Sequence, residues 1–156
     1  MKILIIVKSK HNDNTMKLAE AMSEVAPATV IDIDYAKFYK LSDYDIVGFG
    51  SGIYFGRHAK ELFELIKASH TKNKYCFVFS TSGSKNYEKN NRALIKLLKN
   101  KEKTVLGSFG CQGLDKFFIF RLFGGINKGK PNADDFDAAQ SFINNIMTEY
   151  ENLKNN

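Results

Sequence analysis

The chain has 156 residues, of which 44% are hydrophobic and 26% charged, with two cysteines and a formal net charge of +6. This length and composition describe one globular domain, residues 1–156, that can fold without a disulfide framework. The opening apolar run is too short for a secretory signal, and no other stretch reaches the ~20 residues of a membrane-spanning helix. We therefore expect a cytoplasmic protein without a transmembrane segment.

Short apolar runs alternate with amphipathic segments along the whole chain. Nearly all-apolar runs are typical of strands buried on both faces, and they predict strands at 2–8, 28–34, 43–51, 74–82 and 103–110. Apolar residues at helical spacing predict helices at 15–25, 58–69, 88–99 and 134–153. Strands that alternate with helices require a parallel sheet covered on both faces by right-handed connections. The predicted fold class is therefore α/β, a doubly wound five-stranded parallel sheet.

Four segments follow the carboxyl ends of predicted strands, where ligands of such sheets bind. They read "SKHNDNT" (9–15), "GSGIYFGRH" (50–58), "STSGSKNY" (80–87) and "GCQGLDKFF" (110–118). All four are rich in Gly, Ser, Thr or Asn, whereas "KASHTKNK" (67–74), at the opposite end, is an ordinary polar turn. We therefore expect one edge of the sheet to carry the chemistry.

The first segment has the donors that a phosphate group needs, although it contains no glycine. A strand-to-helix turn presents unpaired backbone N–H groups at the positive end of the helix. Ser9, Asn12, Asn14 and Thr15 add hydroxyl and amide donors, and Lys10 adds a positive charge. The same residue types also cap helices, so simple capping remains the alternative.

The second segment surrounds Tyr54 and Phe55 with four glycines, at positions 48, 50, 52 and 56. Glycine adds no packing and loses much backbone entropy on folding, so we interpret the glycines as sites of close ligand approach. The aromatic side chains, expected to be exposed, could stack on a planar ligand, or they could instead cover a neighbouring helix. "STSG" (80–83) offers further hydroxyl and amide groups toward the same crevice, with Tyr87 nearby.

The cysteines and histidines predict neither a metal site nor a catalytic residue. Cys76 lies in an apolar strand and is expected in the core, while Cys111 lies at the functional edge of the sheet. No histidine follows Cys111 to serve as a base, and the spacing of the cysteines matches no metal motif. His11 and His58 fall in the crevice segments and His70 in a turn.

Taken together, the segment ending Asn14-Thr15, "GFGSGIYFGRH" (48–58), "STSG" and the later "CQG" resemble the flavodoxin family along essentially the whole chain. The resemblance implies strand order 2-1-3-4-5 and non-covalent FMN, with the first segment on the phosphate and the second and third around the isoalloxazine ring. Tyr54 and Phe55 would lie near the ring, and Thr81, Ser82 and Gly83 would donate to its atoms. The cofactor-binding residues predicted in this way are Ser9, Lys10, His11, Asn12, Asn14, Thr15, Ser51, Gly52, Ile53, Tyr54, Phe55, Gly56, Thr81, Ser82, Gly83, Cys111 and Gly113.

Two features depart from the family pattern. Its electron carriers are usually acidic and dock basic partners, whereas this chain is basic. Asp13 also stands where the family usually has glycine, which suggests a backbone with positive φ, and Asn and Asp tolerate that conformation best after Gly. We expect the Asp13 carboxylate to point outward, with Lys10 partly offsetting its charge, and we predict that Asp13→Asn tightens FMN binding.

Three functions remain open at this stage. The leading hypothesis is an FMN-binding redox protein that transfers electrons between cellular partners, which would be a redox partner protein or a small-molecule or quinone acceptor. The second is an FMN oxidoreductase resembling quinone-dependent protoporphyrinogen oxidases, which also carry a basic, aromatic insertion late in the chain. Here "LDKFFIFRLFGGINKGK" (114–130) could be a lid or a membrane-touching segment, or a loop whose phenylalanines seal the core.

The third hypothesis is a non-redox binding module that uses the basic helix 88–99. Helical spacing predicts one stripe that comprises Lys85, Lys89, Arg92, Lys96 and Lys99. This basic stripe could be a solvated outer face opposite Leu94, Leu97 and Leu98, or a docking surface for an acidic partner. We do not expect nucleic acid to be the partner.

Overall fold

A parallel sheet forms the centre of the computed structural model, which describes residues 1–10, 13–71, 74–113, 127 and 129–155. Its parallel strands are β1 (Ile3–Lys8), β2 (Ala28–Asp32), β3 (Ile46–Tyr54), β5 (Tyr75–Ser82) and β6 (Thr104–Gln112). They are ordered β2-β1-β3-β5-β6, and a short strand, β4 (Arg57–His58), pairs antiparallel with β3. Counted along the chain, the parallel strands follow the order 2-1-3-4-5, so the predicted topology is confirmed.

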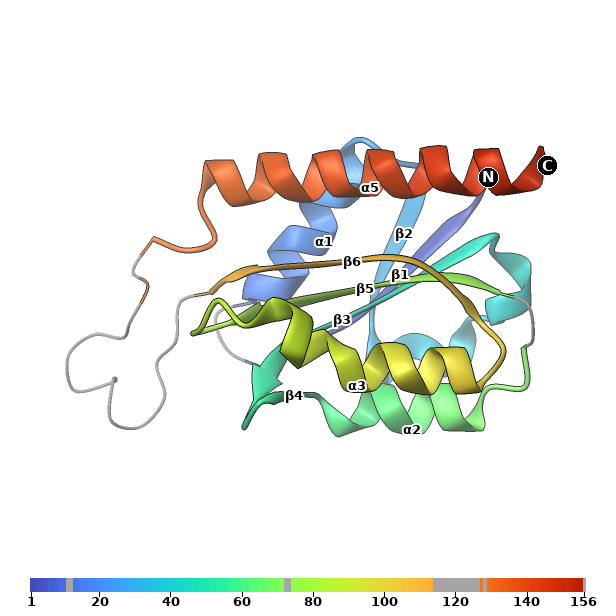
Figure 1. Ribbon diagram of the computed structural model, residues 1–156, viewed down its shortest axis with the longest axis horizontal. Helices are drawn as coiled ribbons and strands as arrows, with labels where there is room; N and C mark the ends of the chain where they lie inside the picture. The colour runs from blue at the N-terminus through green and yellow to red at the C-terminus, as the bar shows by residue number, and fades with distance from the viewer. Residues whose placement is uncertain (11–12, 72–73, 114–126, 128, 156) are drawn as a thin grey trace.

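Helices cover both faces of this sheet (Figure 1). On one face lie α1 (Asn14–Glu24) and α5 (Ala133–Lys154), and on the other α2 (Lys60–Ala68) and α3 (Tyr87–Asn100). Two 3₁₀ helices, η1 (Ile33–Phe38) and η2 (Leu41–Asp43), connect β2 to β3. The predicted helices and strands are all present, with shifted ends.

Two boundaries differ from the prediction for physical reasons. The second strand ends at Asp32, because the side chain of Asp32 accepts a hydrogen bond from the backbone N–H of Asp34 and caps η1. The third strand continues to Tyr54, because β4 pairs with its last residues. The second segment is therefore a strand and hairpin, where a loop was expected.

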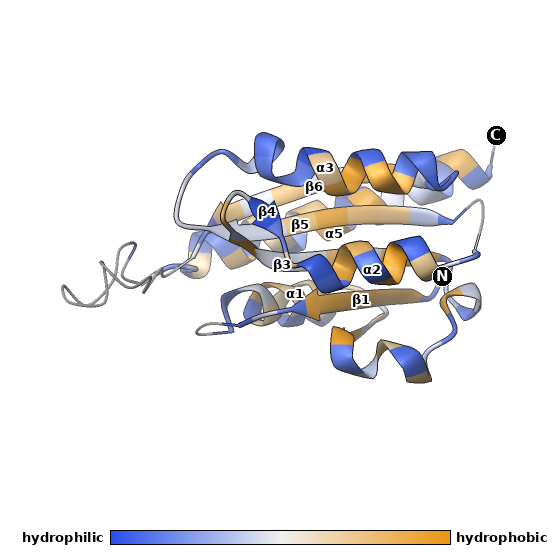
Figure 2. Ribbon diagram, turned by 90° about the horizontal axis from the view of Figure 1, so that it is seen from below, coloured by the Kyte–Doolittle hydropathy of each residue, from blue (hydrophilic) through white to orange (hydrophobic). Residues whose placement is uncertain are grey.

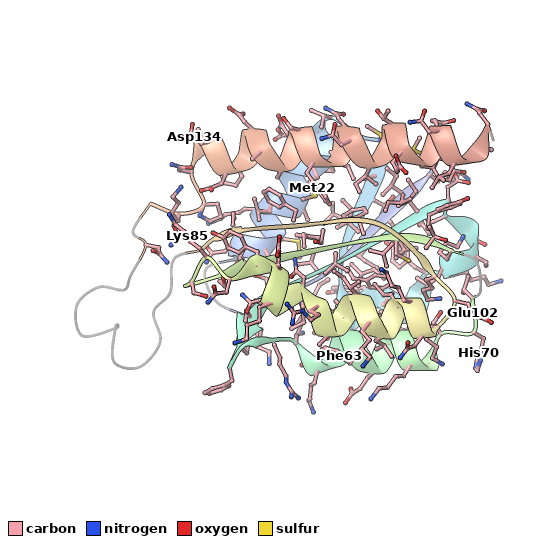
Figure 3. The ribbon with its side chains drawn as sticks, viewed as in Figure 1. Met22, Phe63, His70, Lys85, Glu102 and Asp134 are labelled. Carbon is pink, nitrogen blue, oxygen red and sulfur yellow. The ribbon has the colours of Figure 1, made fainter. Side chains whose placement is uncertain are left out.

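The core has two layers, one on each side of the sheet. Ile3, Ile5 and Val7 pack toward α1 and α5, whereas Leu4 and Ile6 pack toward α2 and α3. All five are buried, as expected for a strand covered on both faces. The helices alternate hydrophobic and hydrophilic residues (Figure 2), and their buried apolar residues belong to the same two core layers. Met22 of α1, for example, is fully buried in the first layer (Figure 3).

Two of the glycines in "GFGSG" belong to this core. A Cβ atom on Gly48 would lie 2.3 Å from Cζ of Phe77, and one on Gly50 would lie 2.1 Å from Cζ of Phe79. The prediction that these glycines serve ligand approach is therefore wrong for Gly48 and Gly50. They make room for phenylalanine rings of the neighbouring strand β5.

In the described part of the chain, no helix is long and apolar enough to cross a membrane. Of the late segment 114–130, the structure describes only Asn127, Gly129 and Lys130, so the predicted lid lies largely outside the described residues.

Candidate functional site

A cavity of about 360 Å³ lies at the carboxyl ends of β1, β3, β5 and β6. Strands β2 and β3 flank β1 on opposite sides, so the chain reverses its strand order beside this cavity, where doubly wound sheets bind ligands. Lys85 lies at this end of the sheet, whereas His70 and Glu102 lie at the other end (Figure 3). The cavity is lined by Ser9, Asn14, Thr15, Gly52, Ile53, Tyr54, Phe55, Thr81, Ser82, Gly83 and Gly113.

The first wall is the turn from β1 into α1. Asp13 has φ 51° and ψ 26°, so the predicted left-handed backbone is confirmed. Its side chain is exposed and does not line the cavity, in agreement with the expected outward orientation. Asn14 and Thr15 follow as the first residues of α1, and both are buried beside the cavity. The conformation of Asp13 thus allows the helix to begin with two polar side chains directed at the site.

Thr15 also connects the first wall to the third wall, which is formed by the end of β5 and by Gly83. Its Oγ1 lies 2.8 Å from Oγ1 of Thr81, the penultimate residue of β5, and both side chains are buried. Thr81 and Ser82 end β5, and Gly83 follows them along the cavity. Hydroxyl groups from two elements therefore meet at one place beneath the cavity.

The second wall is the β3–β4 hairpin. Tyr54 pairs with Arg57, and the two residues between them, Phe55 (φ 51°) and Gly56 (φ 76°), both have left-handed backbones. Positive φ at both central residues is characteristic of a type I′ turn, which matches the twist of a two-residue hairpin. Phe55 is an unusual residue for this conformation, and 92% of its surface is exposed. The turn therefore holds an apolar ring in solvent at the mouth of the cavity.

Tyr54 is half-buried, so the expectation of an exposed aromatic pair is correct only for Phe55. The hydroxyl oxygen of Tyr54 accepts a hydrogen bond of 3.1 Å from the backbone N–H of Lys10. The Lys10 ammonium lies 5.1 Å from the centre of the Tyr54 ring and 3.7 Å from Oε1 of Glu61. Burial raises the pKa of Tyr54, so its phenol is neutral at physiological pH. Tyr54 thus joins the first and second walls.

Asn127 joins the third wall to the end of β6, a role that its sequence position did not reveal. Its Nδ2 donates to the carbonyl oxygens of Gly83 (3.0 Å) and Gly113 (3.3 Å), and its Oδ1 accepts from Nε2 of Gln112 (3.1 Å). Its φ of 56° is one that asparagine tolerates, and the combination of Asn with positive φ could have suggested a special position. Gly113 also fits closely, since a Cβ atom there would lie 2.7 Å from Nδ2 of Asn14.

Four predicted cofactor residues do not line the cavity: Lys10, Ser51, Gly56 and Cys111. Cys111 is buried in the core, where desolvation raises the pKa of its thiol to about 12, so the thiolate that nucleophilic chemistry needs is disfavoured. Cys76 is buried in the second core layer, as predicted. Two further predicted residues, His11 and Asn12, lie outside the described residues.

His58 is buried behind the second wall, so its expected place in a crevice loop is wrong. Its ring contacts Ser51 and Asn91 through hydrogen bonds. Burial lowers the pKa of His58 to about 4, so the ring is neutral at physiological pH. Within the described ranges, no group of three or more His, Cys, Asp or Glu residues could hold a metal ion.

The basic stripe on and beside α3 is exposed along its whole length. Leu94 and Leu98, on the opposite side of the helix, are buried and Leu97 is partly buried, as the helical spacing predicted. None of the five basic side chains of the stripe forms an ion pair with a described residue. The stripe is therefore a positive surface whose charges are not neutralised within the described fold.

The cavity offers binding groups and no strong acid or base among its lining residues. Hydroxyl, amide and backbone groups line the first and third walls, and aromatic rings line the second wall. Such a site suits a planar ligand with a polar, hydrogen-bonding end.

Comparison with known proteins identifies the family. The flavodoxin-domain family profile matches residues 4–128. An uncharacterized protein of Methanocaldococcus jannaschii is 40% identical over 148 residues, which cover 94% of this chain and 99% of the relative. A flavodoxin from the domain Archaea superposes with a TM-score of 0.72 at 15% identity, covering 97% of this chain and 99% of that one.

A flavoprotein from Lactobacillus acidophilus, solved in complex with FMN, superposes with a TM-score of 0.57 at 16% identity, covering 70% of this chain and 92% of that one. At these identities the solved structures establish the shared fold, while the profile match over most of the chain establishes the family. The chain is a member of the flavodoxin family.

Proposed function

We propose that the cavity binds FMN non-covalently and that the protein is an electron-transfer flavoprotein. The observation that carries this proposal is the arrangement of the cavity, in which Asn14, Thr15 and Thr81 face a hairpin that presents Tyr54 and Phe55. The family membership supports it, and so does the FMN bound by the Lactobacillus flavoprotein of the same fold.

The phosphate of FMN would lie at the first wall. The first turn of α1 supplies backbone N–H groups that the helix itself cannot pair and the positive end of the helix dipole, and Ser9, Asn14 and Thr15 add side-chain donors. Lys10, His11 and Asn12 stay predictions, because Lys10 points to Tyr54 and Glu61, and the other two lie outside the described residues.

The isoalloxazine ring would lie between the second and third walls. Tyr54 and Phe55 offer apolar faces for stacking, while Thr81, Ser82 and Gly83 offer hydrogen-bonding groups to the polar edge of the ring. FMN, when bound, supplies the one- and two-electron chemistry. The side chains of the cavity bind the cofactor, fix its orientation and exclude water from one side of it.

The electron-transfer partner is proposed to be an acidic protein that docks on the basic stripe. Opposite charges steer association and orient the partners, and this surface has no compensating ion pairs within the described residues. Lys85 brings the stripe to the same end of the sheet as the cavity (Figure 3). If the protein bound an acidic partner through this surface but bound no flavin, it would be a non-redox binding module, the third hypothesis.

Incubation of the purified protein with FMN, FAD or riboflavin, followed by desalting and a visible spectrum, tests cofactor binding. We expect FMN to be retained in preference to the other two, and a colourless protein after all three incubations would contradict the proposal. FMN-loaded protein is then reduced and mixed with a quinone, and in a separate assay oxidised protein is mixed with protoporphyrinogen. Oxidation of protoporphyrinogen would favour the oxidase over the electron carrier.

A further inference from the structure

A buried polar network lies directly behind the second wall of the cavity. It comprises Ser51 of β3, His58 of β4 and Asn91 of α3, whose exposed fractions are 0%, 4% and 1%. None of the three lines the cavity, but Ser51 precedes Gly52, which does. The network therefore connects the cavity wall to the helix layer beneath it.

Five hydrogen-bonding contacts define the network. Three contacts meet at Ser51 Oγ, which lies 3.0 Å from Ala59 N, 2.8 Å from His58 Nδ1 and 2.8 Å from Gly52 O. The other two involve the Asn91 side chain: its Oδ1 lies 3.0 Å from His58 Nε2, and its Nδ2 lies 3.0 Å from Phe109 O.

The orientation of Asn91 fixes the proton on the imidazole ring. Phe109 O can only accept, so it requires the amide nitrogen of Asn91, and Asn91 Oδ1 then faces His58 Nε2. Nε2 must therefore carry the hydrogen of the neutral ring, which leaves Nδ1 as an acceptor. Ser51 must donate its hydroxyl hydrogen to Nδ1 for this contact to be a hydrogen bond.

With His58 neutral, the network has one hydrogen too few. Ala59 N–H, the Ser51 hydroxyl, the neutral imidazole and the Asn91 amide each provide one hydrogen, so about four serve the five contacts. Ser51 cannot donate to His58 Nδ1 and to Gly52 O at the same time. A proton on Nδ1 would remove the conflict, since the ring would then donate to Ser51, and Ser51 would donate to Gly52 O.

We propose that His58 is a positioning residue that sets the hydrogen-bonding state of the cavity wall through Ser51. When His58 is neutral, the Ser51 hydroxyl donates to His58 Nδ1, and the Gly52 carbonyl oxygen receives no hydrogen bond from Ser51. Protonated His58 turns the hydroxyl toward Gly52 and changes the wall on which the ligand rests. Only the ligand-binding part of this proposal rests on the proposed function.

The charge state of His58 is governed by burial and by neutral partners. Desolvation lowers its pKa and the Asn91 hydrogen bond partly offsets that decrease, with no charged group of the described residues contributing to the shift. On the neighbouring elements, Arg57, Lys60 and Arg92 are exposed, and Glu61 is paired with Lys10. Asn90 of α3 and Ser80 of β5, the strand neighbour of Ser51, are uncharged. The network is therefore an uncharged enclosure in which a single proton has a large effect.

The first test is nitrogen-15 NMR of the full chain without flavin, with the His58 signals assigned by comparison with His58→Asn. We expect the Nε2–H tautomer at pH 7. On acidification, His58 should titrate with a pKa of about 4, well below that of an ordinary histidine, and the Ile53 and Ala59 amide signals should shift with the same midpoint. The Nδ1–H tautomer at pH 7, or a His58 titration that leaves both amides unmoved, would overturn the proposal.

The second test is FMN affinity as a function of pH. His58→Asn keeps a neutral acceptor near Ser51, and comparison with it cancels the titration of the FMN phosphate itself. The protonated state is expected to bind FMN far more weakly, so the wild-type Kd, relative to that of the variant, should be constant from pH 7 to pH 6, rise near pH 4, and reach about twice its pH 7 value at the His58 midpoint that NMR measures. A constant ratio down to pH 4 would contradict the proposal.

Ser51→Ala and Ser80→Ala provide a matched pair of variants that tests the role of the Ser51 hydroxyl. Both hydroxyls are buried on adjacent strands, but Ser80 Oγ has no hydrogen-bond partner within the described residues. Ser51→Ala should abolish the rise of the Kd on acidification relative to His58→Asn, because the variant has no hydroxyl to turn toward Gly52, and Ser80→Ala should retain that rise. Equal effects of the two substitutions would overturn the role of Ser51. If no protein, wild type included, bound FMN while the NMR result was as expected, only the proposed function would be overturned.

Discussion

The hydroxyl oxygens of Thr15 and Thr81 lie 2.8 Å apart in the floor of the cavity, although 66 positions separate them in the chain. This contact links the beginning of α1 to the end of β5. Because both side chains are buried, each hydroxyl depends on the other for a hydrogen bond. The two walls proposed to bind phosphate and ring are thus coupled.

The first prediction concerns this pair. Thr15→Val or Thr81→Val alone should lower the free energy of unfolding by about 1–3 kcal/mol, since each leaves a buried hydroxyl unpaired. The double variant should be destabilised by much less than the sum, because both polar groups are then removed. Urea denaturation of the four proteins measures this coupling, and additive losses would show that the contact contributes nothing.

The second prediction concerns Asp13. Asp13→Asn should tighten FMN binding by about two- to fivefold, because asparagine keeps the left-handed backbone and removes a surface charge near the proposed phosphate site. Glu151→Gln is the control. It removes an exposed carboxylate near the C-terminal end of α5, far from the cavity, and should leave the Kd for FMN unchanged. Unchanged or weaker affinity of Asp13→Asn would refute this account of the residue.

Replacement of Phe55 separates stability from binding. Phe55→Asn creates the Asn-Gly pair preferred in type I′ turns and should raise the free energy of unfolding by about 0.5–1 kcal/mol. The same change removes an apolar ring from the mouth of the cavity and should weaken FMN binding and its fluorescence quenching. A variant that is more stable and binds FMN as tightly as the wild type would exclude a role of this ring in binding.

The Asn127 amide should matter for the cavity more than for the fold. Asn127→Asp keeps an acceptor for Gln112 but loses both donors to Gly83 and Gly113. We expect FMN binding to weaken about tenfold, with a loss of unfolding free energy of about 1–2 kcal/mol. Asn127→Gly, which retains the positive φ and removes the whole side chain, should weaken binding similarly. Wild-type affinity in both variants would rule out the bridging role.

The sequence was sufficient for the sheet, because buried parallel strands leave nearly unbroken apolar runs and the α-helices between most of them leave a helical repeat. It was also sufficient for most of the cavity edge, since the carboxyl ends of parallel strands must meet. Asp13 could be interpreted because backbone conformation is a local property, and its φ of 51° agrees with the expectation.

The errors have a common physical cause, which is that side-chain environment depends on neighbours distant in sequence. Gly48 and Gly50 serve phenylalanines of β5, which their own segment does not reveal. Tyr54 turns inward because the Lys10 backbone offers it a donor from another strand end. Cys111 points into the core, since the register of β6 decides which face of the sheet it occupies. None of these relationships leaves a periodic signal.

The central claim, that this cavity binds FMN, is tested most directly by an equilibrium titration of FMN with flavin-free protein, followed by flavin fluorescence. We predict strong quenching that saturates at one FMN per chain, together with weaker binding by the Thr15→Val and Thr81→Val double variant. Fluorescence that stays at the level of free FMN throughout the titration, in a folded protein, would contradict the account.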